Sequence, residues 1–327
     1  MRTKNKTCEY NKMPLTDHLE NIGNTPLVKI SMDALSDVSL YAKLESYNPT
    51  GSVKDRAAFY ILDKLLRMGE IEPGYTIIES SSGNFGVALS AYCKKFGLKF
   101  ICIIDPHISP INRMLIESSG GVIEEVTEPD QNGGYLLNRI KRVKELKRSI
   151  KESYWINQYE NPLNSGAYHI LGQEIIDGIQ DVNAVFLGVS SGGTITGVSQ
   201  RIKEISPGTK IIAVDITGSI IFGGNPAKRY IPGIGSSKVP AILKLAKIDN
   251  VVMVDEEETI FGCHELLREH HIFAGGSSGS VYAAIRKYYK KNPTPVPVNV
   301  GCIFADRGER YVSTVYNEKW WVKRVMR

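Results

Sequence analysis

The sequence lacks any apolar run that approaches the ~20 residues needed to cross a lipid bilayer, so it predicts no membrane span. The first residues, Met1 to Met13, are polar and lack the apolar core of a signal peptide. Cysteine is scarce: the 5 cysteines, without C-x-x-C spacing, predict neither a disulfide framework nor a zinc site. The 6 histidines show no ligand spacing. These absences predict a protein of the reducing cytoplasm, with no metal and no membrane partner.

The sequence also lacks a large excess of positive or negative charge. The net charge of +5 is spread along the chain, apart from a basic cluster over residues 139–151. An isolated run of this kind is typical of a solvated helix face and gives little support to nucleic-acid binding. We therefore expect no nucleic-acid partner.

Helical and strand-like patterns alternate along the chain. Its 327 residues, 42% of them hydrophobic, suffice for one large or two medium domains. Helical patterns follow Ser52, Gly83, Ser109, Gly133, Ser165, Gly192, Glu256 and Ser277. Strand-like runs cover residues 40–45, 76–78, 100–104, 121–126, 184–189, 210–214, 251–254 and 297–304. Strands separated by helices favour parallel sheets, so the predicted fold class is α/β, with parallel-type sheets flanked by helices.

One stretch, residues 48–56, places a lysine in the first turn of a predicted helix, behind a Pro/Gly turn. Pro49 fixes φ, Gly51 permits a strained backbone, and Ser52 is a good N-cap. Lys54 would then lie near the positive end of the helix dipole, which lowers the pKa of an amine. A neutral amine is a nucleophile that can form a Schiff base, although a lysine taken alone is commonly an ordinary surface residue.

Two glycine/serine loops of the same kind follow, over residues 79–86 and 189–197. Each comes after a strand-like run and opens a helical pattern, so backbone N–H groups and hydroxyls can converge there on an anion. A glycine-rich turn without a ligand is one alternative. A dinucleotide site is another, because Asp215 follows the next strand, but the G-x-G-x-x-G spacing is absent and Lys54 would be left unexplained.

Taken in order, these blocks resemble the cysteine synthase family of pyridoxal-phosphate enzymes of fold type II. The matching blocks cover residues 22–28, 48–56, 81–86, 190–197 and 275–279. The resemblance implies a fold like the tryptophan synthase β chain, with an active site in a cleft between two domains. A smaller, mobile α/β domain would cover residues 45–157, and a larger cofactor-anchoring one would cover 1–44 and 158–327. It also implies a homodimer.

The resemblance implies that the cofactor is pyridoxal 5′-phosphate. Lys54 would bind it covalently and act as a general base. Asn84 would hydrogen-bond the ring hydroxyl, and Ser277 would face the ring nitrogen; a helix cap is the alternative role for both. A hydroxyl keeps the ring closer to neutral than an aspartate would, which suits β-replacement. The phosphate would be cradled by Ser190, Ser191, Gly192, Gly193 and Thr194.

The other loop would then be free for the α-carboxylate of the substrate. The residues assigned to the substrate there are Ser81, Ser82, Gly83 and Phe85. Several departures from the sulfhydrylase pattern put sulfide in doubt as the nucleophile. Phe85 stands where sulfhydrylases have threonine, and Arg307 stands where they usually have a small residue.

Four other segments are similar to a branch of the family that builds 2,3-diaminopropionate precursors for siderophores. They cover residues 105–110, 128–136, 154–159 and 219–223. That branch joins O-phospho-L-serine to the amine of L-glutamate, so these are the expected substrates. A cysteine synthase, a cystathionine β-synthase and a catalytically idle binding or regulatory module remain alternatives.

A glutamate nucleophile brings two carboxylates, so the site needs a cation, and Arg139 is the candidate. It lies on an apolar helical stripe. An arginine in such a place commonly extends to water, and the alternative is a guanidinium directed into the cleft to bind a carboxylate bidentately. Tyr159 and Ser190 could add hydroxyl donors.

Overall fold

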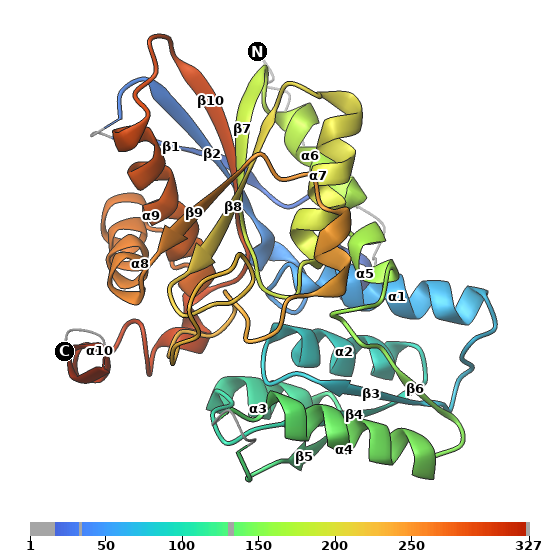
Figure 1. Cartoon of the computed structure of the whole chain (residues 1–327). Coiled ribbons are helices and arrows are strands. Elements are labelled where there is room, and N and C mark those ends of the chain that lie inside the picture. The colour runs from blue at the N-terminus through green and yellow to red at the C-terminus, as the bar shows by residue number, and fades with distance from the viewer. Residues whose placement is uncertain (1–16, 33–34, 130–133, 325–327) are drawn as a thin grey trace, which may run out of the picture.

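The computed structural model describes residues 17–32, 35–129 and 134–324, and two separate sheets form the frame of this part of the chain (Figure 1). The larger sheet has the strand order β1-β2-β10-β7-β8-β9. Its strands are β1 (Leu27–Ile30), β2 (Val38–Leu44), β7 (Val182–Gly188), β8 (Lys210–Ile216), β9 (Asn250–Val254) and β10 (Val298–Phe304). The pairs are parallel except β1 with β2. The predicted parallel sheet is confirmed, with an antiparallel edge strand added.

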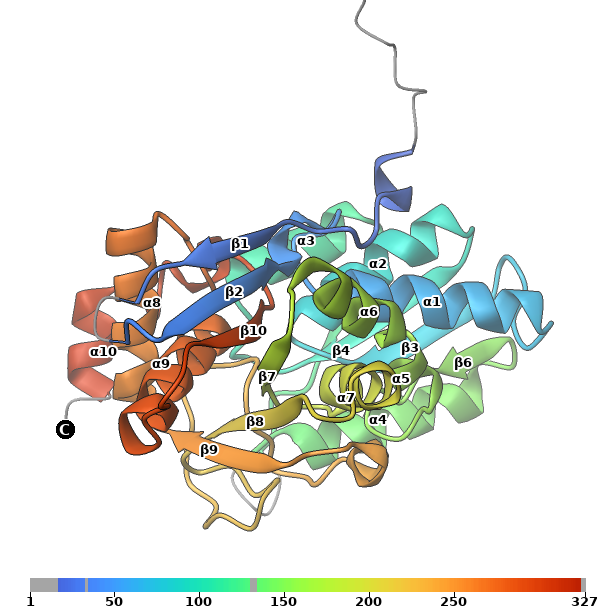
Figure 2. The same cartoon turned by 90° about the horizontal axis from the view of Figure 1, so that it is seen from above.

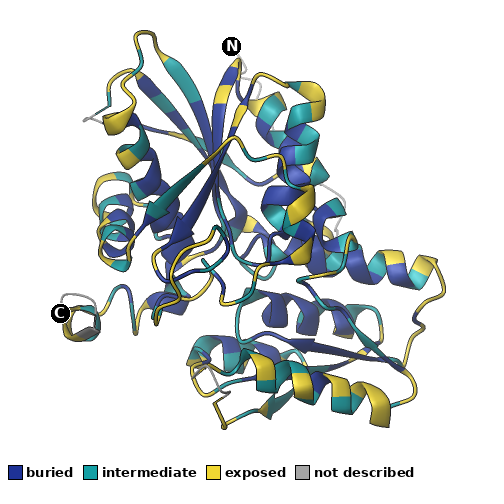
Figure 3. Cartoon of the chain, in the orientation of Figure 1, coloured by how far each residue is buried: buried dark blue, intermediate teal, exposed yellow. Residues whose placement is uncertain are grey.

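Helices cover both faces of the larger sheet (Figure 2). On one face α9 (Gly276–Lys291) lies against β7 to β10, and α8 (Glu256–His270) packs on α9. The other face carries α7 (Gly193–Ile205), with α6 (His169–Gly178) beside it. The central strands are consequently buried from both sides, as the dark blue strands in Figure 3 show. This explains why β8 has a nearly continuous apolar sequence.

The smaller sheet is entirely parallel, with the order β5-β4-β3-β6. Its strands are β3 (Thr76–Ser80), β4 (Lys99–Ile104), β5 (Val122–Glu125) and β6 (Ser153–Trp155). Its helices are α2 (Asn84–Lys95), α3 (Pro110–Ser118) and α4 (Leu136–Ser149). α2 and α4 cover opposite faces of this sheet (Figure 1). The sheet is a continuous piece of chain, whereas the larger sheet takes strands from both sides of it in sequence.

The remaining α-helices of the described residues are α1 (Lys54–Arg67), α5 (Leu163–Gly166) and α10 (Glu318–Arg324). Four short 3-10 helices in the same described ranges are η1 (His18–Glu20), η2 (Glu45–Tyr47), η3 (Ala241–Leu245) and η4 (Gly308–Tyr311). α1 packs against both α2 and α5, so it contacts elements on both sides of the molecule. The helices predicted from the sequence begin within a few residues of their predicted starts, and Gly133, the predicted start of α4, lies outside the described residues. Within the described chain, the helices are too short or too polar to cross a membrane.

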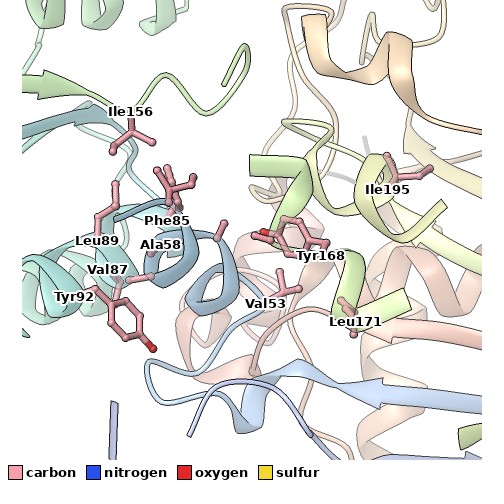
Figure 4. Close-up of a cluster of buried hydrophobic side chains, with 14 of the residues drawn as sticks. Val53, Ala58, Phe85, Val87, Leu89, Tyr92, Ile156, Tyr168, Leu171 and Ile195 are labelled. Atoms are coloured by element: carbon pink, nitrogen blue, oxygen red, sulfur yellow. The ribbon is translucent and has the colours of Figure 1, made fainter. Parts of the chain in front are cut away.

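The largest core cluster joins the two sheets (Figure 4). It includes Val53 and Ala58 at the start of α1, Phe85 at the start of α2, and Ile195 in the first turn of α7. The N-terminal turns of three helices are thus fixed by buried side chains. Because these turns carry the predicted site residues, the core determines where those residues point.

Candidate active site

Lys54 is the first residue of α1 and is half-buried. The turn before it contains Gly51 at φ +84°, as the sequence predicts. The predicted N-cap is off by one residue: Val53 is the cap, although Ser52 Oγ accepts a hydrogen bond from the Lys54 N–H at 3.3 Å. Burial lowers the pKa of Lys54 to about 8, and the nearby Asp306 carboxylate opposes this change. The amine is therefore neutral in a useful fraction of molecules near neutral pH.

The segment after β10 brings three predicted site residues together. Val53 N donates to Ala305 O at 2.8 Å, next to Lys54. Asn84 Nδ2 donates to Asp306 Oδ2 at 2.7 Å. Gly275 N donates to Asp306 O at 3.0 Å, two residues before Ser277. Lys54, Asn84 and Ser277 therefore surround one turn of the chain.

Ser277 lies in the first turn of α9 and is 8% exposed. Gly275 is the N-cap of that helix, so Ser277 is not its cap. The same holds for Asn84, which follows the cap Gly83 of α2. A Cβ built on Gly188, the last residue of β7, would lie 3.8 Å from Ser277 Cβ. Ser277 therefore lies beside the strand end that leads into the predicted phosphate cradle.

That cradle, residues 190–194, forms the link from β7 to α7. Gly192 has φ +84°, a left-handed conformation that favours glycine. A Cβ on Gly193 would lie 2.5 Å from Asn164 Oδ1, so the backbone is closely surrounded. Ser190 Oγ donates to Gly235 O at 3.1 Å, and Thr194 is half-buried in the first turn of α7. Ser191 Oγ is buried and has no hydrogen-bond partner among the described residues.

The second loop, residues 81–86, links β3 to α2. Ser81 Oγ accepts a hydrogen bond from Gly86 N at 3.1 Å, which holds the loop in a tight turn. A Cβ on Gly83 would have no atom of the described chain within 4 Å, so this side of the loop is open. The expectation for Phe85 needs correction. Its side chain is 2% exposed and packs in the core (Figure 4), so only its backbone can face a ligand.

Arg139 extends from α4 to this loop and not to water. Its Nη1 donates to Ser82 Oγ at 2.7 Å and pairs with Asp105 Oδ2 at 2.9 Å. Ser82 Oγ also donates to Asp105 Oδ2 at 3.1 Å, so the three side chains form a closed cluster. The Arg139 side chain is 14% exposed, and its Nε is buried without a partner in the described residues. Of the two orientations weighed from the sequence, the inward one is observed.

Tyr159 lies close to this cluster. Burial raises the pKa of its hydroxyl, and the Arg139 guanidinium opposes that change, as does a hydrogen bond with Ser236. Glu79, at the end of β3, is buried as well. Burial raises the pKa of Glu79 to about 7, although the backbone N–H groups of Ser80 and Gln158 donate to its carboxylate.

Sequence reasoning assigned no role to Glu79, Asp105, Asp306 or Arg310, which all contact or adjoin the predicted residues. Asp306 and Arg310 are buried, 2% and 6% exposed, on either side of Arg307. Charged side chains are rarely buried without partners, so their burial marks them as candidate site residues once the fold is known. The partner that they share, Asn84, lies more than two hundred residues away in sequence, so a local pattern does not predict the contact.

A family model described as a pyridoxal-phosphate-dependent enzyme matches residues 18–306. The chain belongs to this enzyme family. The match covers well over half of the chain and includes Lys54, Asn84, the cradle and Ser277. It also removes the dinucleotide alternative, and Asp215, the acidic residue on which that alternative relied, is completely buried in β8.

Solved structures narrow the family to the cysteine synthase and cystathionine β-synthase enzymes of fold type II, which carry out β-replacement. The chain is 32% identical to an O-acetylserine-dependent cystathionine β-synthase from Helicobacter pylori, with a TM-score of 0.86, covering 93% of this chain and 100% of that one. It is 27% identical to an O-ureido-L-serine synthase, with a TM-score of 0.83, covering 95% and 100%. It is 27% identical to a hydrogen sulfide-producing enzyme from Fusobacterium nucleatum, with a TM-score of 0.84, covering 91% and 99%.

The residues present fit pyridoxal phosphate. Ser191 Oγ is a buried hydroxyl without a partner in the described chain, and it lies at the N-terminus of α7, where backbone N–H groups favour an anion. Gly192 and Gly193 keep this backbone free of side chains. Lys54, with its lowered pKa, supplies the amine that the aldehyde requires. In the described ranges, no group of three or more His, Cys, Asp and Glu could hold a metal.

Proposed function

We propose that this enzyme joins O-phospho-L-serine to L-glutamate, giving N-(2-amino-2-carboxyethyl)-L-glutamate, a 2,3-diaminopropionate precursor for siderophore biosynthesis. One observation carries the choice of glutamate: the Arg139 guanidinium is directed at Ser82 of the substrate loop. Sulfide needs no such cation and homocysteine carries one carboxylate, whereas glutamate brings two carboxylates that a cation must bind. The similarity of four segments to the diaminopropionate branch supports the same choice.

The residues divide between the two substrates. We assign the α-carboxylate of O-phospho-L-serine to Ser81, Ser82 and the backbone N–H groups at Gly83 and Phe85, at the N-terminus of α2. We assign a carboxylate of glutamate to Arg139, with the Tyr159 hydroxyl as a second donor. Asp105 already occupies Nη1 of Arg139, so it orients the guanidinium and neutralises part of its charge.

Lys54 moves the proton. Its Nζ removes the α-proton of the first substrate, after which the phosphate leaves from Cβ. The glutamate amine then adds to Cβ and loses a proton to solvent, and Lys54 Nζ returns a proton to Cα. When bound, the cofactor supplies an electron sink for the negative charge at Cα. Asn84 and Ser277 orient its ring, and Ser190 to Thr194 hold its phosphate. A pKa near 8 suits a lysine that must be both nucleophile and base.

A second candidate is a cystathionine β-synthase or cysteine synthase. The 32% identity to an O-acetylserine-dependent cystathionine β-synthase favours it. Mass spectrometry of the products decides between the two. The holoenzyme is offered O-phospho-L-serine or O-acetyl-L-serine, each with glutamate, homocysteine and sulfide in parallel. A carbon–nitrogen adduct with glutamate as the main product supports the proposal. A dominant thioether or cysteine product contradicts it.

We also propose the two-domain division and the homodimer implied by the family resemblance. The strands of the smaller sheet lie between Thr76 and Trp155, which is compatible with a domain over residues 45–157. Light scattering of the purified protein measures the mass of the particle. Twice the chain mass of 36.3 kDa is expected, and a mass of one chain contradicts the dimer.

A further inference from the structure

The turn after β10, residues 305–311, contacts the Lys54 turn, the Asn84 helix and the Ser277 helix, yet none of the roles above uses its side chains. Asp306 is 2% exposed and Arg310 is 6% exposed. Burying a carboxylate and a guanidinium is costly unless hydrogen bonds replace their water. The hydrogen-bond partners of Asp306 and Arg310 therefore indicate the function of these two residues.

Arg310 donates to two acceptors that are not carboxylates. Its Nη1 donates to Asn84 Oδ1, and its Nη2 donates to Thr50 O in the turn before Lys54. A single guanidinium thus spans the first turn of α2 and the approach to α1. A planar fork holds both acceptors in fixed directions from two separate nitrogens, whereas a lysine offers all its donors from one freely rotating nitrogen.

Asp306 holds the other end of the same amide. Its Oδ2 accepts from Asn84 Nδ2 at 2.7 Å and from the Tyr311 hydroxyl at 2.8 Å. The Asn84 amide therefore has its oxygen bound to a cation and one N–H bound to an anion. This arrangement determines which end is oxygen, and it leaves one N–H of Nδ2 for a ligand.

We propose that Arg310 and Asp306 are positioning residues that fix the amide of Asn84 and direct its remaining N–H at the ring hydroxyl oxygen of bound pyridoxal phosphate. This inference rests on the role proposed for Asn84. The guanidinium also polarises the amide through its oxygen, which makes Nδ2–H a stronger donor. Neither residue touches the cofactor in this scheme, so both act through Asn84.

A double-mutant cycle tests this without any substrate. Apoproteins are prepared with Arg310→Lys, Asn84→Ala and both changes, and pyridoxal phosphate is titrated into each by absorbance. With Asn84 present, Arg310→Lys should raise Kd about tenfold, because it weakens a charge-assisted hydrogen bond. In the Asn84→Ala background it should change Kd less than about twofold, since the path through Asn84 is removed and only the contact with Thr50 O remains. An equal loss in both backgrounds, or no loss with Asn84 present, overturns the proposal.

Arg307→Lys is the matched control, because Arg307 lies in the same turn with its side chain 59% exposed and should leave Kd unchanged. Thermal unfolding of each apoprotein verifies folding. If Arg310→Lys does not fold, the same cycle is measured with Asp306→Asn. An equal change in Kd with and without Asn84 then overturns the proposal. A Kd that Asn84→Ala leaves unchanged refutes the role of Asn84 and the inference together. A wrong choice of substrates would leave every Kd in the cycle as expected.

Discussion

Residues 190–194 and 81–86 both connect the end of a parallel strand to the first turn of a helix, yet their surroundings differ. The first loop is enclosed: a Cβ on Gly193 would collide with Asn164, and Ser191 Oγ is buried without a partner in the described chain. The second is open at Gly83, and its Ser82 hydroxyl is engaged by Arg139 and Asp105. Enclosure suits a group that stays bound through every turnover, and an open loop suits a substrate that enters and leaves.

The largest expected difference between the two loops is their response to one added methyl group. Asn164 is 1% exposed and donates to Gln158 O at 2.7 Å, so it cannot turn away from Gly193→Ala. Overpacking costs about 1–3 kcal/mol and displaces the N–H groups of α7, so cofactor affinity should fall about a hundredfold. Gly83→Ala meets no atom and should leave that affinity unchanged. Absorbance titration of the two apoproteins measures both values, and equal affinities would break the comparison.

The next effect separates the two substrates. Arg139→Ala should still release phosphate from O-phospho-L-serine in a single turnover, because glutamate has not yet arrived. The reaction with glutamate should slow about ten- to a hundredfold, since a charge-assisted hydrogen bond is lost. Rapid-mixing measurements of phosphate and product distinguish the two steps. Arg142→Ala is the control, because this arginine lies on the same helix, is half-buried and pairs with Glu124. A variant that releases no phosphate would show that Arg139 serves the first substrate.

A smaller effect on binding is expected from replacing one serine in each loop, Ser191 or Ser82. Ser191→Ala should weaken cofactor binding about tenfold, since one hydrogen bond to a phosphate is lost. Its apoprotein should be no less stable, because the buried hydroxyl has no partner to lose within the described structure. Ser82→Ala should leave cofactor affinity unchanged and raise the KM for O-phospho-L-serine. Titration and steady-state kinetics measure these values. If Ser82→Ala weakened cofactor binding and Ser191→Ala raised only the KM, the roles of the two loops would have to be exchanged.

The smallest effect is a shift in the pH dependence of Lys54. An amine reacts with a neutral acylating reagent only when it is unprotonated. The rate at Lys54 in the apoprotein should therefore rise with pH, reach half its maximum near the pKa of about 8, and level off above it. Peptide mapping by mass spectrometry follows the label, with exposed Lys94 as the reference site. A Lys54 rate that still rises steeply through pH 10 would show that the amine is not buried.

Local chemistry explains which site residues the sequence could predict. Lys54 and the cradle lie in strand–turn–helix units whose glycines and caps fall within ten residues, and both appear where expected. The Phe85 assignment was misleading because successive residues of a helix point about 100° apart. Asn84 faces the site, and its neighbour faces the core. The direction of the Arg139 side chain depends on its contact with Asp105, and the role of Asp306 depends on its contact with Asn84. Each contact joins separate segments of the chain, so no local sequence pattern predicts it.

The position of β10 has a consequence for how the protein is made. β10 is the last strand in sequence, yet it lies between β2 and β7 in the middle of the larger sheet. The smaller sheet is complete in the chain after Trp155, so it can form during synthesis, but the larger one has a gap until residue 304 leaves the ribosome. Residues 305–311 emerge after that. Lys54 and Asn84 are therefore translated early, but the segment that contacts both of them is translated late. Chains truncated before β10 consequently cannot assemble the site.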